Sequence, residues 1–394
     1  MRRLFVHVKR MIAMAVRGGK MRFLHTSDLH IGKRVNGFSM LEDQREILRQ
    51  ITEIAVGEDC QGMIIAGDIY DRPAPGADAV VLFDRFLCDL AEKGIRVIVI
   101  SGNHDSPERV AYLGELLEKS GVTVSRKFDG SLQCVSMEDE HGRLNVYLLP
   151  YVKASTIRPF FPDREILSCE DGVRAILEQT PMTLSGRNIL VCHQFITGAE
   201  PGGSEELSVG GLDSVSAELF DAFDYVAMGH IHGAQKHRRE TVRYSGSPLK
   251  YSFSEADHTK SVMIVDVEEL GNVQVRKVPL ILPREMREIR GTMEELLAYP
   301  VTDDYVRVIL TDEEVAPDAR FTLQVNFPNM MRFAVENSRT MMEMEIEPVD
   351  IAEDKSPLEL FEAFYRMQNG GVEPDGRRLT IVKEILEKLQ EDDR

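Results

Sequence analysis

The chain has 394 residues, of which 43% are hydrophobic, so it can bury one large core and a second, smaller one. Its formal net charge of -18 argues against a protein that coats nucleic acid by itself, because non-specific affinity comes from Lys and Arg that neutralise phosphates. The five cysteines are scattered without a Cys-x-x-Cys spacing, and no segment holds 18 continuous apolar residues. We therefore exclude a disulfide framework and a membrane span, and expect a cytoplasmic protein.

Residues 1–20 hold six Lys or Arg and no acidic residue. A weak amphipathic targeting arm, a basic nucleic-acid contact and a translation start assigned too early all fit this composition. The third reading is favoured, because the first expected strand begins at Met21. Residues 1–20 are accordingly interpreted as an extension that precedes the first domain.

Five runs along the chain are predicted to be buried strands, at residues 22–24, 63–66, 96–100, 189–191 and 225–227. Polar residues follow each run directly or within a few positions. The strings are Asp28-Leu29-His30, Gly67-Asp68, Gly102-Asn103-His104-Asp105, Cys192-His193 and Gly229-His230-Ile231-His232. In an α/β sheet, the loops beyond the carboxyl ends of the strands lie together, so groups that are distant in sequence can converge there.

Carboxylate, carboxamide and imidazole groups together suit manganese, iron or zinc. A pair of such ions can hold both the attacking and the leaving oxygen of a phosphodiester. One string alone would be a chance match, whereas five in this order after five strands predict a two-metal phosphoesterase. The seven candidate ligands are Asp28, His30, Asp68, Asn103, His193, His230 and His232.

The ordered strings resemble those of the calcineurin-like metallophosphoesterases and, within them, the SbcD family of bacterial nuclease subunits. Further supporting strings are residues 21–33, Leu41-Glu42-Asp43-Gln44, residues 207–213 and Tyr244-Ser245-Gly246-Ser247-Pro248. The resemblance runs from about Met21 into the C-terminal tail. It implies a four-layer α/β/β/α sandwich, two Mn²⁺ ions, and a nuclease that acts in DNA repair, recombination and hairpin processing. With an SbcC-type ATPase partner it would be an ATP-dependent double-strand exonuclease, and it would also be a single-strand endonuclease.

By the same resemblance, one ion would be held by Asp28, His30, Asp68 and His232, and the other by Asp68, Asn103, His193 and His230, with Asp68 as the bridge. His104 would stabilise the transition state or protonate the leaving oxygen, and Asp105 would orient its imidazole. The alternative for His104 is a packing or hydrogen-bonding role within its loop.

Strands are also predicted at residues 242–244, 261–267 and 273–278, and prolines at 279 and 283 end the last of them. The catalytic domain is thus expected to span residues 21–280. Residues 281–350 would form a small α+β domain with a helix at 293–298 and strands at 305–310 and 331–335. By resemblance this is a capping domain that orients DNA over the metals.

Residues 351–394 are expected to form C-terminal helices. Ser356-Pro357 is typical of a helix start, and Leu358, Phe361, Phe364 and Tyr365 fall on one face. A second apolar face joins Leu379, Val382, Ile385, Leu386 and Leu389. These helices either dock on their own domain or bind a partner. The partner is favoured, because SbcD-like chains end in helices that bind the SbcC-type ATPase; the family also implies a homodimer within a heterotetramer, associated with the nucleoid and not with a membrane.

Two other functions compete with the nuclease. A phosphomonoesterase or cyclic-nucleotide phosphodiesterase could share all seven ligands, because loops and the cap choose the substrate. A non-catalytic scaffold would be expected to have lost a ligand, and none is missing from this sequence.

Overall fold

The computed structural model describes residues 20–182, 186–202 and 213–338, together with positions 358, 361–362, 365–366, 374–379 and 381–382. Residues 1–19 of the basic extension, the string at 207–212 and most of the two predicted tail helices lie outside the described residues. The described residues up to Glu288, with Asp303–Val306, form a larger compact unit, and Ile289–Thr302 with residues from Arg307 onward form a smaller one. The predicted domain limits at 280 and 350 remain predictions.

The first sheet of the larger unit has six strands in the order β16-β15-β1-β4-β5-β6. Their bounds are β1 Met21–Thr26, β4 Gly62–Ala66, β5 Arg96–Ile100, β6 Val122–Val124, β15 Ser261–Val267 and β16 Val273–Pro279. Strands β1, β4, β5 and β6 are parallel, whereas β15 and β16 are each antiparallel to their neighbours. The three parallel strands β1, β4 and β5 are almost wholly buried, and β4 is entirely apolar, as expected for a sheet that is covered on both faces.

The second sheet has the order β13-β14-β12-β9-β8-β7. Its strands are β7 Gln133–Asp139, β8 Gly142–Leu149, β9 Arg187–Cys192, β12 Tyr225–Met228, β13 Gln235–His237 and β14 Arg239–Tyr244. Strands β14, β12, β9 and β8 are parallel, and the two edge strands are antiparallel to their neighbours. The strands predicted before each metal-ligand string are confirmed as β1, β4, β5, β9 and β12.

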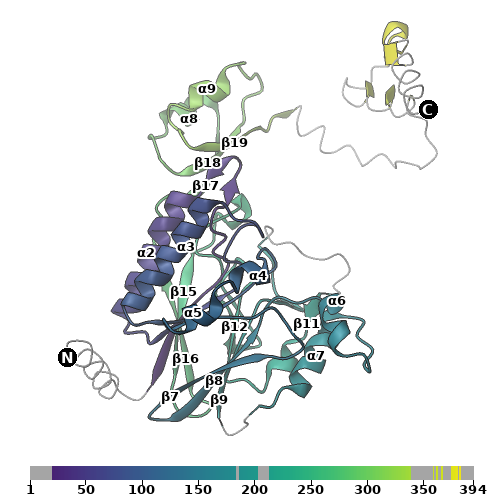
Figure 1. The fold of residues 1–394 in the computed structure, drawn as a ribbon. Coiled ribbons are helices and arrows are strands. Elements are labelled where there is room, and N and C mark those ends of the chain that lie inside the picture. The colour runs from purple at the N-terminus through teal and green to yellow at the C-terminus, as the bar shows by residue number, and fades with distance from the viewer. Residues whose placement is uncertain are drawn as a thin grey trace. The chain divides into compact units, whose positions relative to one another are not determined.

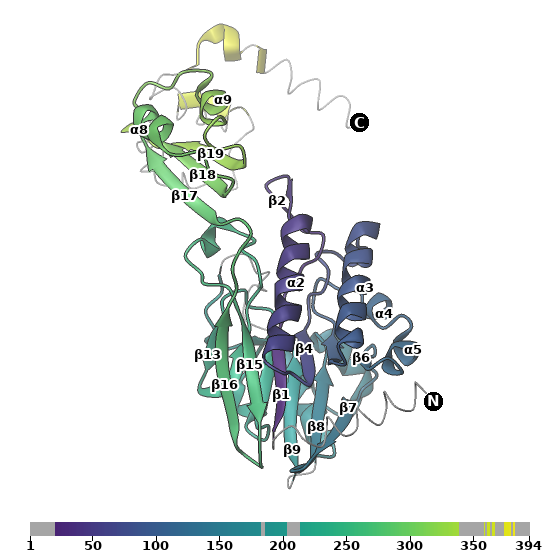
Figure 2. The same ribbon diagram turned by 90° about the vertical axis from the view of Figure 1, so that its left-hand side faces the viewer.

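The two sheets pack face to face, and one buried cluster contains side chains from both, including Phe23 and Ile64 of the first sheet and Val146 and Val191 of the second. Helices α2 (Leu41–Gly57) and α3 (Ala77–Glu92) lie along the first sheet (Figure 1, Figure 2). Helix α7 (Cys169–Gln179) packs on the second sheet (Figure 1). The predicted four-layer α/β/β/α sandwich is confirmed.

Short elements fill the connections of this unit. They are β2 Arg34–Val35, β3 Phe38–Ser39, α4 Pro107–Val110, α5 Gly114–Glu118, α6 Ala154–Ile157, η1 Arg158–Phe160, β10 Phe195–Ile196, β11 Ser214–Val215, η2 Ala217–Phe220 and η3 Phe253–Glu255. Across the described part of the chain, no helix combines the length and the apolar character that a membrane crossing needs.

A third sheet has the order β17-β18-β19, formed by Met286–Gly291, Tyr305–Leu310 and Met330–Val335. All of it except Met286–Glu288 and Tyr305–Val306 belongs to the smaller unit. The helices of that unit are α8 Met293–Ala298 and α9 Ala319–Leu323. Helix α8 begins at a capping box, in which Thr292 and Glu295 satisfy each other's backbone N–H groups. The helix predicted at 293–298 and the strands predicted at 305–310 and 331–335 are confirmed, the last with one additional residue.

Candidate metal centre

The loops after β1 and β4 in the first sheet are tied together by backbone hydrogen bonds, from Asp28 N to Gly67 O and from His30 N to Asp68 O, both 3.0 Å long. A side-chain bond then links the sheets: Nδ1 of His193, after β9, lies 2.7 Å from the carbonyl oxygen of Ala66 in β4. The parallel strands of the two sheets therefore bring their carboxyl ends to one place, as the sequence predicted.

One group of donors comes from Asp28, His30 and His232, whose ligand atoms all lie within 4.8 Å of one another. The Nε2 atoms of His30 and His232 face each other at 3.1 Å. All three residues are buried. Two imidazole nitrogens and a carboxylate oxygen that lie this close together, away from bulk water, form a donor set that fits a transition-metal ion.

A second group gathers around Asn103, whose Oδ1 lies 3.1 Å from His193 Nε2 and 3.0 Å from His230 Nδ1. Asp68 lies between the two groups, since its Oδ2 is 3.3 Å from His193 Nε2 and 3.7 Å from His30 Nε2. The structure thus brings all seven predicted ligands together, with the predicted bridging carboxylate in the middle.

The backbone is strained at four of these ligands. A positive φ is sterically unfavourable for a residue with a Cβ, costs on the order of 1–3 kcal/mol, and clusters at functional sites. The residues and their angles are Asp28 (54°), His30 (44°), Asp68 (51°) and His230 (100°). The surrounding fold holds these side chains in place against a local preference, which is the expected signature of a preorganised site.

Glycines allow the loops to approach this closely. A Cβ on Gly102 would clash with the backbone nitrogen and Oδ1 of Asp68. A Cβ on Gly229 would clash with the carbonyl oxygen of Ala66 and come within 2.7 Å of His193 Nδ1. The Gly that precedes Asn103 and the Gly that precedes His230 are therefore part of the site's construction.

Burial and the contacts between oppositely charged groups shift the pKa values of the predicted ligands in opposite directions. Burial raises the pKa of Asp28 to about 6 and lowers that of His230 to about 3. Burial alone would lower the pKa of His193, but the charge and hydrogen bond of Asp68, together with Asp28 and the Ala66 carbonyl, raise it to about 9.

Burial alone would likewise raise the pKa of Asp68, but the charge and hydrogen bond of His193, together with His30 and His104, hold it well below its usual range. The charge of Asp68 is thus stabilised by the facing His193, whereas burial disfavours the charge of Asp28. A divalent cation at this place would stabilise both carboxylates.

His104 lies at this site, where its ligand atom groups with those of His30 and Asp68. Its backbone N–H donates to Asp68 Oδ1 at 2.9 Å, and its Nδ1 lies 3.1 Å from the carbonyl oxygen of Asp71. An N–H at Nδ1 that donates to this carbonyl leaves Nε2 as the second functional atom of the ring.

The role of Asp105 in orienting the His104 imidazole remains a prediction. In the structure the buried carboxylate of Asp105 accepts backbone N–H groups from Ile69 (3.1 Å), Tyr70 (3.0 Å) and Gly102 (2.9 Å). Adjacent residues of a tight loop direct their side chains apart, so Asp105 fixes the loops after β4 and β5 to each other. Its contribution to the site is to hold the backbone.

Sequence reasoning missed the buried pair Glu255 and Lys260. Glu255 Oε1 lies 3.1 Å from His232 Nδ1, and Lys260 Nζ lies 2.5 Å from Glu255 Oε2. Burial alone would raise the pKa of Glu255, but hydrogen bonding to His232 and the Lys260 charge hold it well below its usual range. No metal-ligand spacing marks these residues in the sequence; a Glu and a Lys in a short polar segment read as surface.

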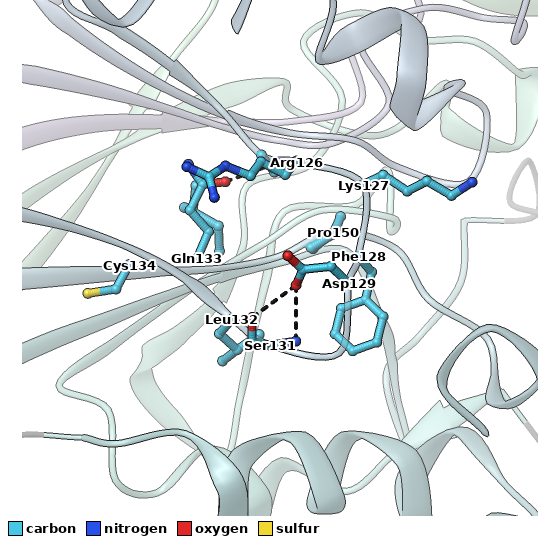
Figure 3. Close-up of a pocket in the computed structure, with 11 residues that line it drawn as sticks. Arg126, Lys127, Phe128, Asp129, Ser131, Leu132, Gln133, Cys134 and Pro150 are labelled. Atoms are coloured by element: carbon cyan, nitrogen blue, oxygen red, sulfur yellow. Dashed lines mark hydrogen bonds between the residues drawn. The ribbon is translucent and has the colours of Figure 1, made fainter. Parts of the chain in front are cut away.

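The larger unit also contains a pocket of about 220 Å³ in the loop between β6 and β7 (Figure 3). Arg126, Lys127 and Phe128 line it, and Asp129 accepts hydrogen bonds there from the backbone N–H and Oγ of Ser131. None of the seven candidate ligands, all of which are described, lines this pocket. The metal centre and this pocket are distinct features.

Residues 21–234, more than half of the chain, match the family model of the calcineurin-like phosphoesterases, and the chain belongs to this family. It is therefore a hydrolase of phosphate esters from a family that uses divalent metals. Residues 282–369 match a second model, the SbcD C-terminal domain, described as the type 5 capsule protein repressor C-terminal domain. The two matches together identify an SbcD-type member of the metallophosphoesterase superfamily.

Two solved structures are similar to parts of this chain. One is a dimetal phosphatase from Danio rerio, at 11% identity and a TM-score of 0.39, covering 66% of this chain and 96% of the phosphatase. The other is a protein of Thermus thermophilus, at 12% identity and a TM-score of 0.37, covering 66% of this chain and 99% of that protein.

Proposed function

We propose that this chain is the DNA nuclease subunit of an SbcCD-like complex and that it hydrolyses phosphodiester bonds at a site for two Mn²⁺ ions. The observation that carries the proposal is the position of Asp68, within 3.3 Å of His193 Nε2 and 3.7 Å of His30 Nε2. One carboxylate between two sets of donors is what a pair of ions requires. The SbcD-type C-terminal domain supports DNA as the substrate.

The two donor sets share Asp68. Asp28, His30 and His232 complete one set, and Asn103, His193 and His230 complete the other. Bound there, the cations supply Lewis acidity and lower the pKa of a water molecule. Asp28 and Asp68 contribute two negative charges, and Asn103 contributes a neutral oxygen, so the loaded site retains a net positive charge. That charge favours a phosphate group.

His104 is proposed as the catalytic residue that contacts the phosphodiester. Its Nδ1 is held by the carbonyl of Asp71 at 3.1 Å, so the ring has a fixed orientation. Its ring centroid lies 4.7 Å from that of His30, beside the metal ligands and partly exposed. From there Nε2 can stabilise a phosphate oxygen or donate a proton to the leaving oxygen.

The rest of the assembly is a proposal of the same kind. The net charge of -18 makes a strong unaided grip on DNA unfavourable, so a partner has to supply much of it. We assign this to an SbcC-type ATPase bound through residues 351–394, while residues 281–350 orient the DNA. The complex would contain two copies of this chain and work in the cytoplasm at the nucleoid, in repair, recombination and hairpin processing.

The test is cleavage of circular single-stranded DNA by the purified chain with Mn²⁺, so that no free end or partner is needed. Asp68→Ala should lose both cleavage and bound metal, whereas His104→Ala should lose cleavage and keep metal. His141→Ala is the matched control, since His141 is exposed in the turn between β7 and β8, and it should cleave like wild type. Full activity of His104→Ala would remove its catalytic assignment.

A small-substrate phosphoesterase would give a different pattern. The wild-type chain would leave DNA intact and hydrolyse a simple phosphate ester with the same dependence on Asp68. That result would replace the nuclease proposal while leaving the metal centre in place.

A further inference from the structure

A buried ionic network lies behind His232. Glu255 is 0% exposed and Lys260 is 3% exposed. The Lys260 ammonium donates to Glu255 Oε2 (2.5 Å), Ser247 Oγ (2.8 Å) and the backbone carbonyl of His232 (3.0 Å). The three acceptors match the three N–H bonds of the ammonium group. One acceptor is the backbone of the predicted ligand His232, and another is the carboxylate that contacts the His232 ring.

This network determines which nitrogen of His232 carries the proton. An ionised carboxylate can only accept, so the 3.1 Å contact with Glu255 Oε1 requires a proton on Nδ1 of His232. In the neutral ring Nε2 is then a bare lone pair, and it is Nε2 that faces His30 Nε2 at 3.1 Å. Lys260 neutralises the buried charge that Glu255 needs for this.

We propose that Glu255 and Lys260 are positioning residues that lock His232 in the Nδ1–H form and so tune one of the two metal positions selectively. The inference rests on the proposed two-metal function. The second position is built differently, because His193 Nδ1 lies 2.7 Å from a neutral acceptor, the carbonyl of Ala66. A carboxylate partner makes an imidazole a better electron donor than a carbonyl does, so His232 is the stronger ligand of the two.

The variant Glu255→Gln tests the lock with almost no change of shape. Lys260 can only donate, so it attracts the carbonyl oxygen of the new amide and leaves the amide NH₂ directed at His232 Nδ1. The ring must then accept at Nδ1 and carry its proton on Nε2, where the proton blocks metal binding. We expect about 10- to 100-fold weaker affinity for one Mn²⁺ ion and little change for the other.

The double variant Glu255→Gln/Lys260→Met separates the lock from general damage. Without the ammonium, the amide can turn its carbonyl to His232 and restore the Nδ1–H form. Affinity for the weakened Mn²⁺ should therefore recover in the double variant, although a second buried polar group has been removed. A purely structural role for the pair predicts the opposite order, with the double variant worst.

Asp139→Asn is the matched control. Asp139 pairs with the buried Arg187 at the start of β9, at the end of that strand opposite His193. This change also removes a carboxylate from a buried ion pair, so it should cost comparable stability. It should leave both Mn²⁺ affinities unchanged.

Two measurements on the full chain decide the matter: calorimetric titration of the metal-free protein with Mn²⁺, and ¹⁵N NMR of labelled histidines in the metal-free protein. A switch of His232 from Nδ1–H to Nε2–H in Glu255→Gln, with one weakened site and recovery in the double variant, supports the proposal. Wild-type tautomer and affinity in Glu255→Gln, or equal weakening of both sites, overturns it. If Glu255→Gln shows the tautomer switch but the wild-type chain binds no Mn²⁺, the two-metal function is overturned and the lock alone is supported.

Discussion

The metal centre and the C-terminal part of the chain differ in how directly their residues indicate a function. At the centre, buried groups such as Asp68 and His193 lie within a few ångströms of each other, and their chemistry limits what they can do. The C-terminal part is proposed to select substrate and partner through a small α+β domain and apolar helix faces. Apolar faces of this kind can pack on many different proteins, so they do not identify the partner. The reaction class can therefore be inferred from contacts in the structure, whereas the assignment of DNA as substrate and of the ATPase as partner depends on family resemblance.

Metal removal should have the largest effect on cleavage, and it tests the metal centre without involving the C-terminal part. A chelator should abolish all cleavage by the purified chain, because the proposed water activation depends on the ions. Added Mn²⁺ should restore it without refolding, since the strained backbone at Asp28, His30, Asp68 and His230 already directs the ligands inward. Cleavage of DNA that persists after complete chelation would refute the metal mechanism.

Deletion of residues 356–394 addresses the second region. The ATPase complex should be lost entirely, while metal-dependent cleavage of a small phosphodiester by the isolated chain should persist. Co-purification with the partner and a phosphodiester assay on the same sample measure the two properties. Loss of both would mean that the tail is needed by the catalytic fold, and the division between the two regions would be wrong.

Gly102→Ala should damage the centre without removing any functional group. The added methyl would clash with the backbone and carboxylate of Asp68, which should lower the free energy of unfolding by about 3 kcal/mol and weaken Mn²⁺ binding. Gly57→Ala is the control, because it lies at the end of α2 with open space around its Cβ, and should change stability by about 1 kcal/mol or less. Denaturant unfolding and Mn²⁺ titration measure both; equal behaviour of the two variants would contradict the close-approach argument.

Asp105→Asn should have the smallest effect. The replacement keeps an oxygen acceptor but loses the charge that binds the N–H groups of Ile69, Tyr70 and Gly102, so we expect a loss of about 2 kcal/mol in stability. Because the role is to hold two loops, the His104 ring should keep its tautomer, which ¹⁵N NMR can report. An altered His104 tautomer would favour the role that the sequence suggested for Asp105.

The ordered ligands were visible in the sequence because each follows a short apolar strand, and parallel strands end at one edge. Helix α8 was predicted within its observed bounds, and its capping box explains why it starts where it does. The backbone contacts of Asp105 could not be predicted from the sequence, because neighbouring residues in a loop do not have to face each other. Glu255 and Lys260 could not be found, since their burial depends on tertiary packing that no local spacing encodes.

The metal centre is assembled from both sheets. The loops after β1, β4 and β5 supply Asp28, His30, Asp68 and Asn103, and the loops after β9 and β12 of the other sheet supply His193, His230 and His232. The buried cluster shared by the two sheets therefore fixes their relative position. A slide of one sheet over the other would move the donor atoms of the two sheets apart. A truncation deep in that cluster, such as Val146→Ala, can thus loosen metal binding from a distance. The metal affinity of this chain therefore reports how precisely its two sheets are aligned.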